Sequence, residues 1–259
     1  MDNDIRDRLK QRLIFALRKK LENYNPEPAS MPFHKRLLGQ DRIALFSFIQ
    51  SLNTNFGVTI FEPIAVEFAK QKFKIAETQQ TAGKYIFSEA HNQIQHIIDE
   101  LATQNIIPTK EQEIERLRKV CRTGTKIPVK LTKVDLKLID FDDKIYLIDI
   151  KTAKPNFGQF KEFKRTLLEW VAATLADNPT ADIQTLIAIP YNPYEPKPYD
   201  RWTMKGMIDI NNELKVAAEF WDFLSKTTVY NDLLDLFEEV GNILRPEIDK
   251  YFSKFRQEN

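Results

Sequence analysis

The most regular alternation of hydrophobic and polar positions lies at residues 133–151, which read KVDLKLIDFDDKIYLIDIK. Six apolar residues occupy every second position on the two sides of an acidic turn: Val134, Leu136, Leu138, Tyr146, Ile148 and Ile150. A period of two over several residues is typical of a β-strand, because successive side chains point to opposite faces. The stretch therefore predicts a β-hairpin with one wholly apolar face.

The opposite face of this hairpin carries charge, with Asp135 on the first strand and Asp149 and Lys151 on the second. Their proximity depends on the register. A two-residue turn at Phe141 and Asp142 would send the two aspartates to opposite faces, whereas a three-residue turn centred on Asp142 would set Asp135 opposite Asp149. The sequence leaves both registers open.

Carboxylates beside a lysine on an apolar hairpin are costly to bury unless a cation or hydrogen bonds compensate. Mg²⁺ prefers carboxylate oxygens and keeps open water positions, so this stretch predicts a metal site. The alternative is a charged strand end that makes a surface ion pair. The pattern Asp-x-Lys also occurs at 135–137 and 142–144, and only the strand context favours 149–151.

Apolar residues spaced by three and four predict a series of helices along the rest of the chain. These cover residues 5–21, 41–52, a segment beginning at Pro63, 85–101, 157–176 and 230–240, with a last short helix near Pro246. The apolar run at 183–189 predicts a strand. The order of helix, hairpin, helix and strand predicts an α/β fold, with a mixed central sheet and a right-handed crossover.

The domain organisation follows from the prolines and the helical patterns. Residues 1–31 are expected to form an N-terminal amphipathic helix and a linker, since Pro26 and Pro28 stop the helix. Residues 32–259 are expected to form a single domain. Its core would span about 85–190, and a recognition and helical C-terminal part would span about 191–259.

Glu89 lies on the expected helix at 85–101. If this helix packs on the hairpin, Glu89 could reach the metal as an additional carboxylate. An exposed helix acid is the alternative.

Overall charge does not indicate a partner, because 38 basic residues stand against 37 acidic ones. The local distribution is more informative. Basic residues gather immediately before and within the hairpin, with Asp135 as the single acid among them: Arg116, Arg118, Lys119, Arg122, Lys126, Lys130, Lys133 and Lys137. Such a run favours a phosphate backbone approaching the metal site, and a solvated helix end and strand face is the alternative.

The remaining composition fits a cytoplasmic protein. Cys121 is the single cysteine and cannot form an internal disulfide, and no Cys/His cluster has zinc-ligand spacing. The charged amino terminus and the lack of an apolar run of eighteen residues indicate neither export nor membrane insertion.

Residues 190–202 combine four prolines with three tyrosines, a tryptophan and two basic residues. They predict a rigid loop, with Lys197, Tyr199 and Arg201 available to enter a DNA groove. A proline-rich connector is the alternative.

Asp135 and the later Asp149-Ile150-Lys151, preceded by a helix with Glu89 and followed by a helix and a strand, resemble the PD-(D/E)xK nuclease superfamily. The resemblance implies an α-β-β-β-α-β core. Val134 stands where the superfamily has proline, and the first core strand is expected near residues 126–130.

Longer segments look like the TdeIII-type family of Type II restriction endonucleases, over most of the chain beyond the first thirty residues. They are residues 32–57, FEPIAVEFAK, NPYEPKPYDRWTMKGMIDI, AEFWDFL and YNDLLDLFEEVG. The resemblance implies a homodimeric, Mg²⁺-dependent enzyme that cuts double-stranded DNA at a short palindrome of the GGNCC kind. A cognate DNA methyltransferase would be its system partner, without a stable complex.

The resemblance also implies residue roles. Asp135, Asp149 and the main-chain carbonyl of Ile150 would hold one or two Mg²⁺ ions, Lys151 would orient the attacking water, and Glu89 would assist. The expected DNA contacts are Lys133, Lys154, Lys197, Tyr199 and Arg201. A structure-specific or repair nuclease of the same superfamily and a non-catalytic DNA-binding module remain the alternatives.

Overall fold

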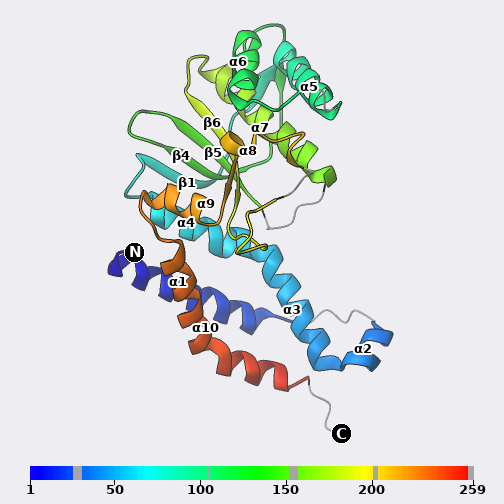
Figure 1. The fold of residues 1–259 in the computed structure, drawn as a ribbon, viewed down its shortest axis with the longest axis vertical. Helices are drawn as coiled ribbons and strands as arrows, with labels where there is room; N and C mark the ends of the chain where they lie inside the picture. Colours follow the sequence, from blue (N-terminus) through cyan, green and yellow to red (C-terminus); the bar gives the residue numbers. More distant parts are fainter. Residues whose placement is uncertain (26–30, 104–105, 152–156, 201–203, 256–259) are drawn as a thin grey trace. The chain divides into compact units, whose positions relative to one another are not determined.

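The computed structural model describes residues 1–25, 31–103, 106–151, 157–200 and 204–255 (Figure 1). The chain forms two compact units. Unit 1 comprises Met1–Ile64 and Thr228–Asn259, and unit 2 comprises Ala65–Thr227.

Unit 1 is helical. Its elements are α1 (Asn3–Asn23), α2 (Pro32–Leu38), α3 (Gln40–Phe56), the π-helical turn η1 (Gly57–Phe61) and α10 (Tyr230–Ser253), and α4 (Glu62–Ala69) continues from it into unit 2. The helices α1 and α10 lie side by side, joined by ion pairs of Arg6 with Glu239 (2.8 Å) and of Arg18 with Glu247 (2.7 Å) (Figure 1). Residues far apart in the sequence therefore build one helical unit.

The N-terminal helix is not the separate extension expected for residues 1–31. Its apolar stripe is buried inside unit 1, because α10 and η1 pack against it and α3 residues join Leu21 in one core cluster. The buried residues are Ile5, Leu9, Leu13 and Leu21. The expected break near Pro246 is also wrong, since α10 continues through this proline to Ser253.

Unit 2 is built on a five-stranded mixed sheet in the order β1-β4-β5-β6-β7. The strands are β1 (Ile75–Gln80), β4 (Val134–Ile139), β5 (Ile145–Ile150), β6 (Ile183–Ile189) and β7 (Leu214–Val216). The pairs β1–β4 and β4–β5 are antiparallel, and β5–β6 and β6–β7 are parallel. The predicted α/β class with a mixed sheet flanked by helices is confirmed.

Helices cover the two faces of this sheet. On one face α7 (Phe157–Asp177) connects β5 to β6 and supports α5 (Ser88–Ala102) and α6 (Lys110–Val120) (Figure 1). On the other face α9 (Ala218–Ser225) places Phe223 against Tyr146 of β5, with ring centroids 5.3 Å apart. The charged end of β5 thus lies in a sheet whose apolar surfaces are covered.

The prediction that the first strand of the sheet lies near residues 126–130 is wrong. Residues 126–130 contribute β3 (Lys126–Pro128), which pairs with β2 (Tyr85–Phe87) in a separate two-stranded sheet, so the expected helix at 85–101 starts only at Ser88. The strand next to β4 is β1. Its sequence IAETQQ shows little alternation because it is an edge strand with no fully buried residue.

Among the described residues, no single helix is long and apolar enough to cross a membrane. One bent pair, Gln40–Asn53 with Gly57–Ala69, meets the length and composition criteria together, with a bend of 58°.

Candidate active site

The β4–β5 register brings the two aspartates together. The pairs Leu136↔Ile148 and Ile139↔Ile145 centre the hairpin on Asp142, as a three-residue turn requires. Asp143, the last turn residue, has φ +62°, the left-handed conformation typical of such turns. One step beyond the last pair, Asp135 stands opposite Asp149, so the three-residue register is confirmed.

The Asp135 carboxylate is held by two donors. The Ile150 N–H donates to its Oδ2 (2.8 Å), and the Gln79 side-chain amide donates to its Oδ1 (3.3 Å). Gln79 stands opposite Asp135 on β1 and has φ +55°, which is unusual for a residue with a Cβ. Strained backbone at a cluster of charged groups is a feature of functional sites. Gln79 was not predicted as a site residue, because β1 itself was not predicted.

Asp149 is a buried carboxylate, only 3% exposed, and Lys151 Nζ lies 2.6 Å from it. Burial raises the pKa of Asp149 to about 6, and Asp135 adds to the rise, while the positive charge of Lys151 opposes it. Lys151 Nζ also lies 4.9 Å from the ring centroid of Phe163 on α7. Two carboxylates and one lysine therefore converge at one end of the sheet.

This donor set suits a hard divalent cation. Two neighbouring carboxylates in a mostly buried position repel each other, and a cation between them relieves that repulsion. Within the described ranges, no three Asp, Glu, His or Cys side chains gather as a ready-made cage. Mg²⁺ is bound in proteins by one or two carboxylates and keeps several waters, so the pair fits Mg²⁺ better than a metal that needs a full protein cage.

Glu89 lies in the first turn of α5, is exposed, and accepts a hydrogen bond from Asn92 Nδ2 (3.4 Å). In the part of the chain that the structure describes, no contact joins it to Asp135 or Asp149. Its role as a ligand stays a prediction.

Three members of the basic run before the hairpin hold the fold together. Arg116 pairs with Glu100 (2.5 Å), Arg118 donates to the carbonyls of Pro179 and Ala181, and Arg122 donates to the carbonyls of Ala176 and Asp177 at the end of α7. Cations at a helix C-terminus satisfy its unpaired carbonyls. The expectation that the whole run approaches a phosphate backbone is wrong for these arginines.

Lys130 and Lys133 of the same run are exposed on the segment that leads into β4. Trp170 on α7 fixes this segment by donating its indole N–H to the Thr132 carbonyl (2.9 Å). Lys133 precedes Asp135 by two residues in the sequence, and its role as a DNA contact stays a prediction.

Within residues 190–200, the proline-rich loop makes contacts with itself. The Tyr194 and Tyr199 rings lie 5.8 Å apart, and Asn192 Nδ2 donates to the Lys197 carbonyl (2.7 Å). The Lys197 side chain is exposed and Tyr199 is half-buried. Lys154 and Arg201, the other expected DNA contacts, lie outside the described residues.

A buried ionic network fixes the chain that follows this loop. Glu213 of α8 (Ile210–Glu213) bonds to Lys110 Nζ of α6 (2.7 Å) and to Lys164 Nζ of α7 (2.5 Å). Lys164 Nζ also lies 2.6 Å from Glu113, and Asp209 at the start of α8 accepts from the Lys110 N–H (3.0 Å). A search for apolar stripes misses this cluster, because buried charges look like surface residues in the sequence.

The charges of this network depend on one another. Burial disfavours ionisation of Glu213, yet Lys110 and Lys164 outweigh it and hold the pKa of Glu213 below its usual value. Burial also lowers the pKa of Lys110. Removing one partner therefore leaves an uncompensated buried charge.

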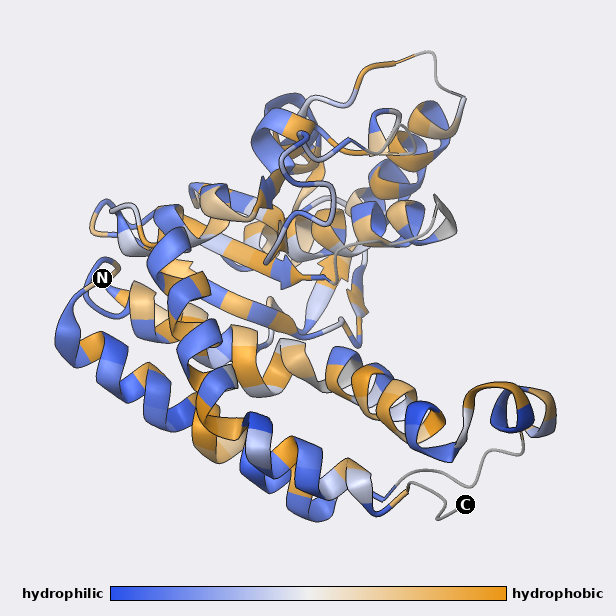
Figure 2. Cartoon of the chain, turned by 60° about the horizontal axis from the view of Figure 1, so that its bottom comes forward, coloured by the Kyte–Doolittle hydropathy of each residue, from blue (hydrophilic) through white to orange (hydrophobic). Residues whose placement is uncertain are grey.

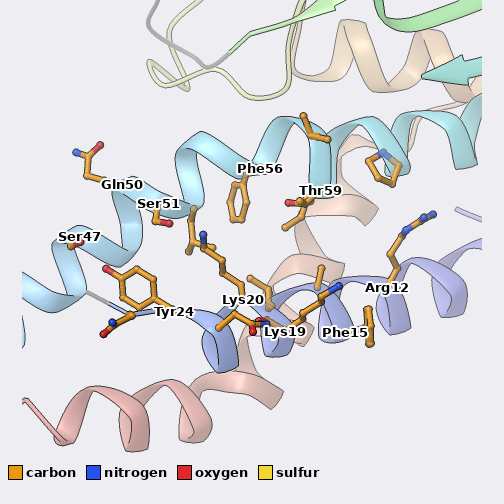
Figure 3. A pocket seen from close by; sticks show the side chains of 18 residues that line it. Arg12, Phe15, Lys19, Lys20, Tyr24, Ser47, Gln50, Ser51, Phe56 and Thr59 are labelled. Carbon is orange, nitrogen blue, oxygen red and sulfur yellow. The ribbon is translucent and has the colours of Figure 1, made fainter. Parts of the chain in front are cut away.

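Unit 1 contains a separate cleft of about 1040 Å³ between α1 and the segment formed by α3 and η1. Arg12, Lys19 and Lys20 line it, and none of its described lining residues is acidic. In Figure 3, Lys20 points into the space between α1 and Phe56. The cations of this cleft, with no acidic residue among the described lining residues, suit an anionic ligand.

Comparison with known proteins defines the class of the chain. Residues 1–241 match the family described as Type II restriction endonuclease, HinfI. The restriction enzyme HgiCII of Herpetosiphon aurantiacus is 27% identical over 223 residues, which cover 85% of this chain and 80% of the relative. The restriction enzyme MjaII of Methanocaldococcus jannaschii is 24% identical over 220 residues, which cover 81% of this chain and 58% of the relative.

The chain is thus a site-specific deoxyribonuclease of the Type II restriction class. It belongs to the HinfI family of these enzymes. The expectation of a Type II restriction endonuclease is confirmed, and binding of DNA follows from the class. Type II restriction enzymes generally need a divalent metal ion.

Proposed function

We propose that the enzyme hydrolyses both strands of DNA at a short palindrome, of the GGNCC kind implied by the sequence resemblance, with Mg²⁺ as cofactor and as a homodimer. The observation that carries this proposal is the convergence of Asp135, Asp149 and Lys151 at the end of two facing strands. A palindrome presents the same bases to two symmetry-related subunits, and one active site cuts one strand. A cognate DNA methyltransferase in the same cytoplasm would protect the host sites.

Each residue of the site has a distinct task in this proposal. Asp135, fixed by the Ile150 N–H and by Gln79, and Asp149 would hold the metal together with the Ile150 carbonyl. Bound Mg²⁺ supplies Lewis acidity, positions water and offsets negative charge on the phosphate. A cation beside Asp149 also favours its ionised form, which burial otherwise disfavours.

Lys151 stands beside this carboxylate, with its Nζ 2.6 Å from Asp149 Oδ1. From there its ammonium group would orient the attacking water and favour its deprotonation. Lys133 would receive a neighbouring phosphate, and the exposed Lys197 would contact the duplex from the proline-rich loop.

The test is digestion of unmethylated phage DNA by the purified full chain with Mg²⁺. Discrete fragments whose ends map to one palindromic sequence support the proposal, and EDTA should abolish them. A continuous smear contradicts site-specific cutting, and intact DNA contradicts Mg²⁺-dependent cleavage. Asp149→Asn should lose most of this cleavage, and Asp142→Asn, on the exposed hairpin turn, is its matched control.

A further inference from the structure

Helix α3 has apolar residues on two sides, and unit 1 covers only one of them. Ala44 and Phe48 recur every four residues and are buried with Leu21 and Phe252. On the other side, Leu45, Phe46 and Ile49 are exposed. A helix that is apolar around most of its circumference is normally buried, so its exposed side lacks a covering surface.

The short helix α2 packs against α3 and also exposes apolar residues. Phe33 and Leu37, one turn apart, are 84% and 82% exposed, and α2 contributes no buried residue to the core of unit 1. The chain turns back at Gly39, whose φ of +90° suits glycine, and α2 packs against α3. A helix of seven residues is marginal alone, so it needs tertiary contacts for stability.

We define the α2–α3 patch as the exposed residues Phe33, Leu37, Leu38, Leu45, Phe46 and Ile49. Figure 2 shows hydrophobic residues recurring along these two helices. Their exposed parts amount to roughly 700 Å² of apolar surface, since a full aromatic side chain offers about 150–250 Å². The largest apolar patch of a soluble monomer is typically about 300–600 Å². A stable interface buries about 800 Å² on each partner, so the patch matches what one dimer contact needs.

We propose that the α2–α3 patch is the surface through which two copies of this chain associate about a two-fold axis. This inference rests on the proposed dimer and assigns its location. The helix α1 exposes a large apolar side chain at Phe15 (68%) and buries Ile5, Leu9, Leu13 and Leu21, so it offers no comparable apolar surface. Lys35 and Arg36 are exposed beside the patch and would form a polar rim.

Other occupants fit the patch less well than a second copy. Protein–DNA interfaces are polar and strongly basic, whereas aromatic and aliphatic side chains dominate this patch. An interfacial membrane helix pairs one apolar face with a fully polar one, and α3 instead buries its opposite side in a protein core. A two-fold contact needs only the self-complementary apolar surface that the patch supplies.

The first test measures association by sedimentation of the full chain over a range of concentrations. Phe46→Glu should raise the dimer dissociation constant by at least about thirtyfold, the effect of losing an interface hot spot. Phe141→Glu is the matched control, because Phe141 is 72% exposed on the hairpin turn of unit 2 and should leave the dimer unchanged. Circular dichroism checks that both variants are folded.

A second test uses cross-linking and does not require a variant that weakens association. Cys121 is buried, so Phe33→Cys or Ile49→Cys introduces a single exposed thiol. A short bismaleimide should join two copies through either position. It should not join copies of the control Ile107→Cys, which carries its thiol on an exposed site of unit 2.

The outcomes separate this inference from the proposed function. A dimer that withstands Phe46→Glu and fails to cross-link at position 33 or 49 has its interface elsewhere, which overturns the inference and leaves the enzyme a dimer. A wild-type monomer, free and on duplex DNA, overturns both the patch and the dimer, whereas digestion of phage DNA reports separately on site-specific hydrolysis. If the inference holds, Phe46→Glu should accumulate nicked rather than linear plasmid.

Discussion

Asp149→Asn should stabilise the metal-free enzyme at neutral pH, although it removes an ion pair with Lys151. Burial raises the pKa of Asp149 from 3.8 to about 6, so the folded state holds a proton that the unfolded state releases as the pH rises. The unfolded state is therefore favoured progressively between about pH 4 and pH 6. Asparagine is neutral at every pH and removes this dependence.

The magnitude follows from the change in pKa. A rise of roughly two pH units in the pKa corresponds to about 3 kcal/mol, because one unit is worth about 1.4 kcal/mol. Above pH 6 the ionised carboxylate costs the folded protein that amount, and below pH 4 it costs nothing. The unfolding free energy of Asp149→Asn minus that of wild type should therefore be about 3 kcal/mol larger at pH 7.5 than at pH 4.

Urea unfolding in EDTA at the two pH values measures this difference. Asp142→Asn is the control, since a solvent-exposed turn residue should change stability by no more than about 0.5 kcal/mol at either pH. Adding Mg²⁺ at pH 7.5 should stabilise wild type and not Asp149→Asn. If the stability of Asp149→Asn relative to wild type is lower at pH 7.5 than at pH 4, the Asp149 carboxylate serves a structural ion pair. That result would contradict a metal site at Asp149.

Three further changes test other parts of the structure. Gln79→Ala should slow cleavage by about two- to tenfold in a single-turnover assay, through loss of one hydrogen bond to Asp135, and an unchanged rate would remove Gln79 from the site. Glu213→Gln should cost about 3–5 kcal/mol in urea unfolding, whereas Glu247→Gln, in an exposed ion pair, should cost under about 1 kcal/mol; equal losses would contradict the buried network. Arg201→Ala should relax or abolish site preference, through loss of a guanine contact worth about 1–3 kcal/mol. If sequencing shows the same cut ends as for wild type, Arg201 makes no such contact.

The sequence predicted the hairpin well because one face is buried. Burial fixes the period of two, whereas the sequence left two registers open, and the structure was needed to place Asp135 opposite Asp149. The strand at 183–189 and the helix before it were equally clear, since both are dominated by buried residues.

Other features left no such signal. The strand β1 is an edge strand with no buried side chain, so its residues look like a loop, and Gln79 stayed hidden with it. The buried charged residues around Glu213 look like exposed residues in the sequence until their partners from α6 and α7 are known. Arg122 donates to the end of α7 and Arg118 to the loop after it, and both depend on contacts more than fifty residues away in the sequence.

The division into units also needed the structure. The helix at the amino terminus and the helix at the carboxyl end meet through pairs such as Arg18 with Glu247, whose separation of 229 residues no local pattern reports. In the sequence, the residues of the α2–α3 patch are visible only as apolar positions, and the pattern does not show that they are exposed. Its exposure is what distinguishes an association surface from a core.

The most direct test of the catalytic site combines duplex binding and cleavage for Asp149→Asn and Lys151→Ala, with Asp142→Asn and Lys144→Ala as controls on the same hairpin. Without metal, Asp149→Asn should bind duplex DNA at least as tightly as wild type, because Asp149 repels phosphate. Lys151→Ala should bind nearly as tightly as wild type, because Lys151 is not needed to hold the duplex. Their cleavage rates with Mg²⁺ should fall by about a hundredfold or more, while the controls cut normally. Near-normal cutting by folded Asp149→Asn would contradict the account and place the metal site elsewhere.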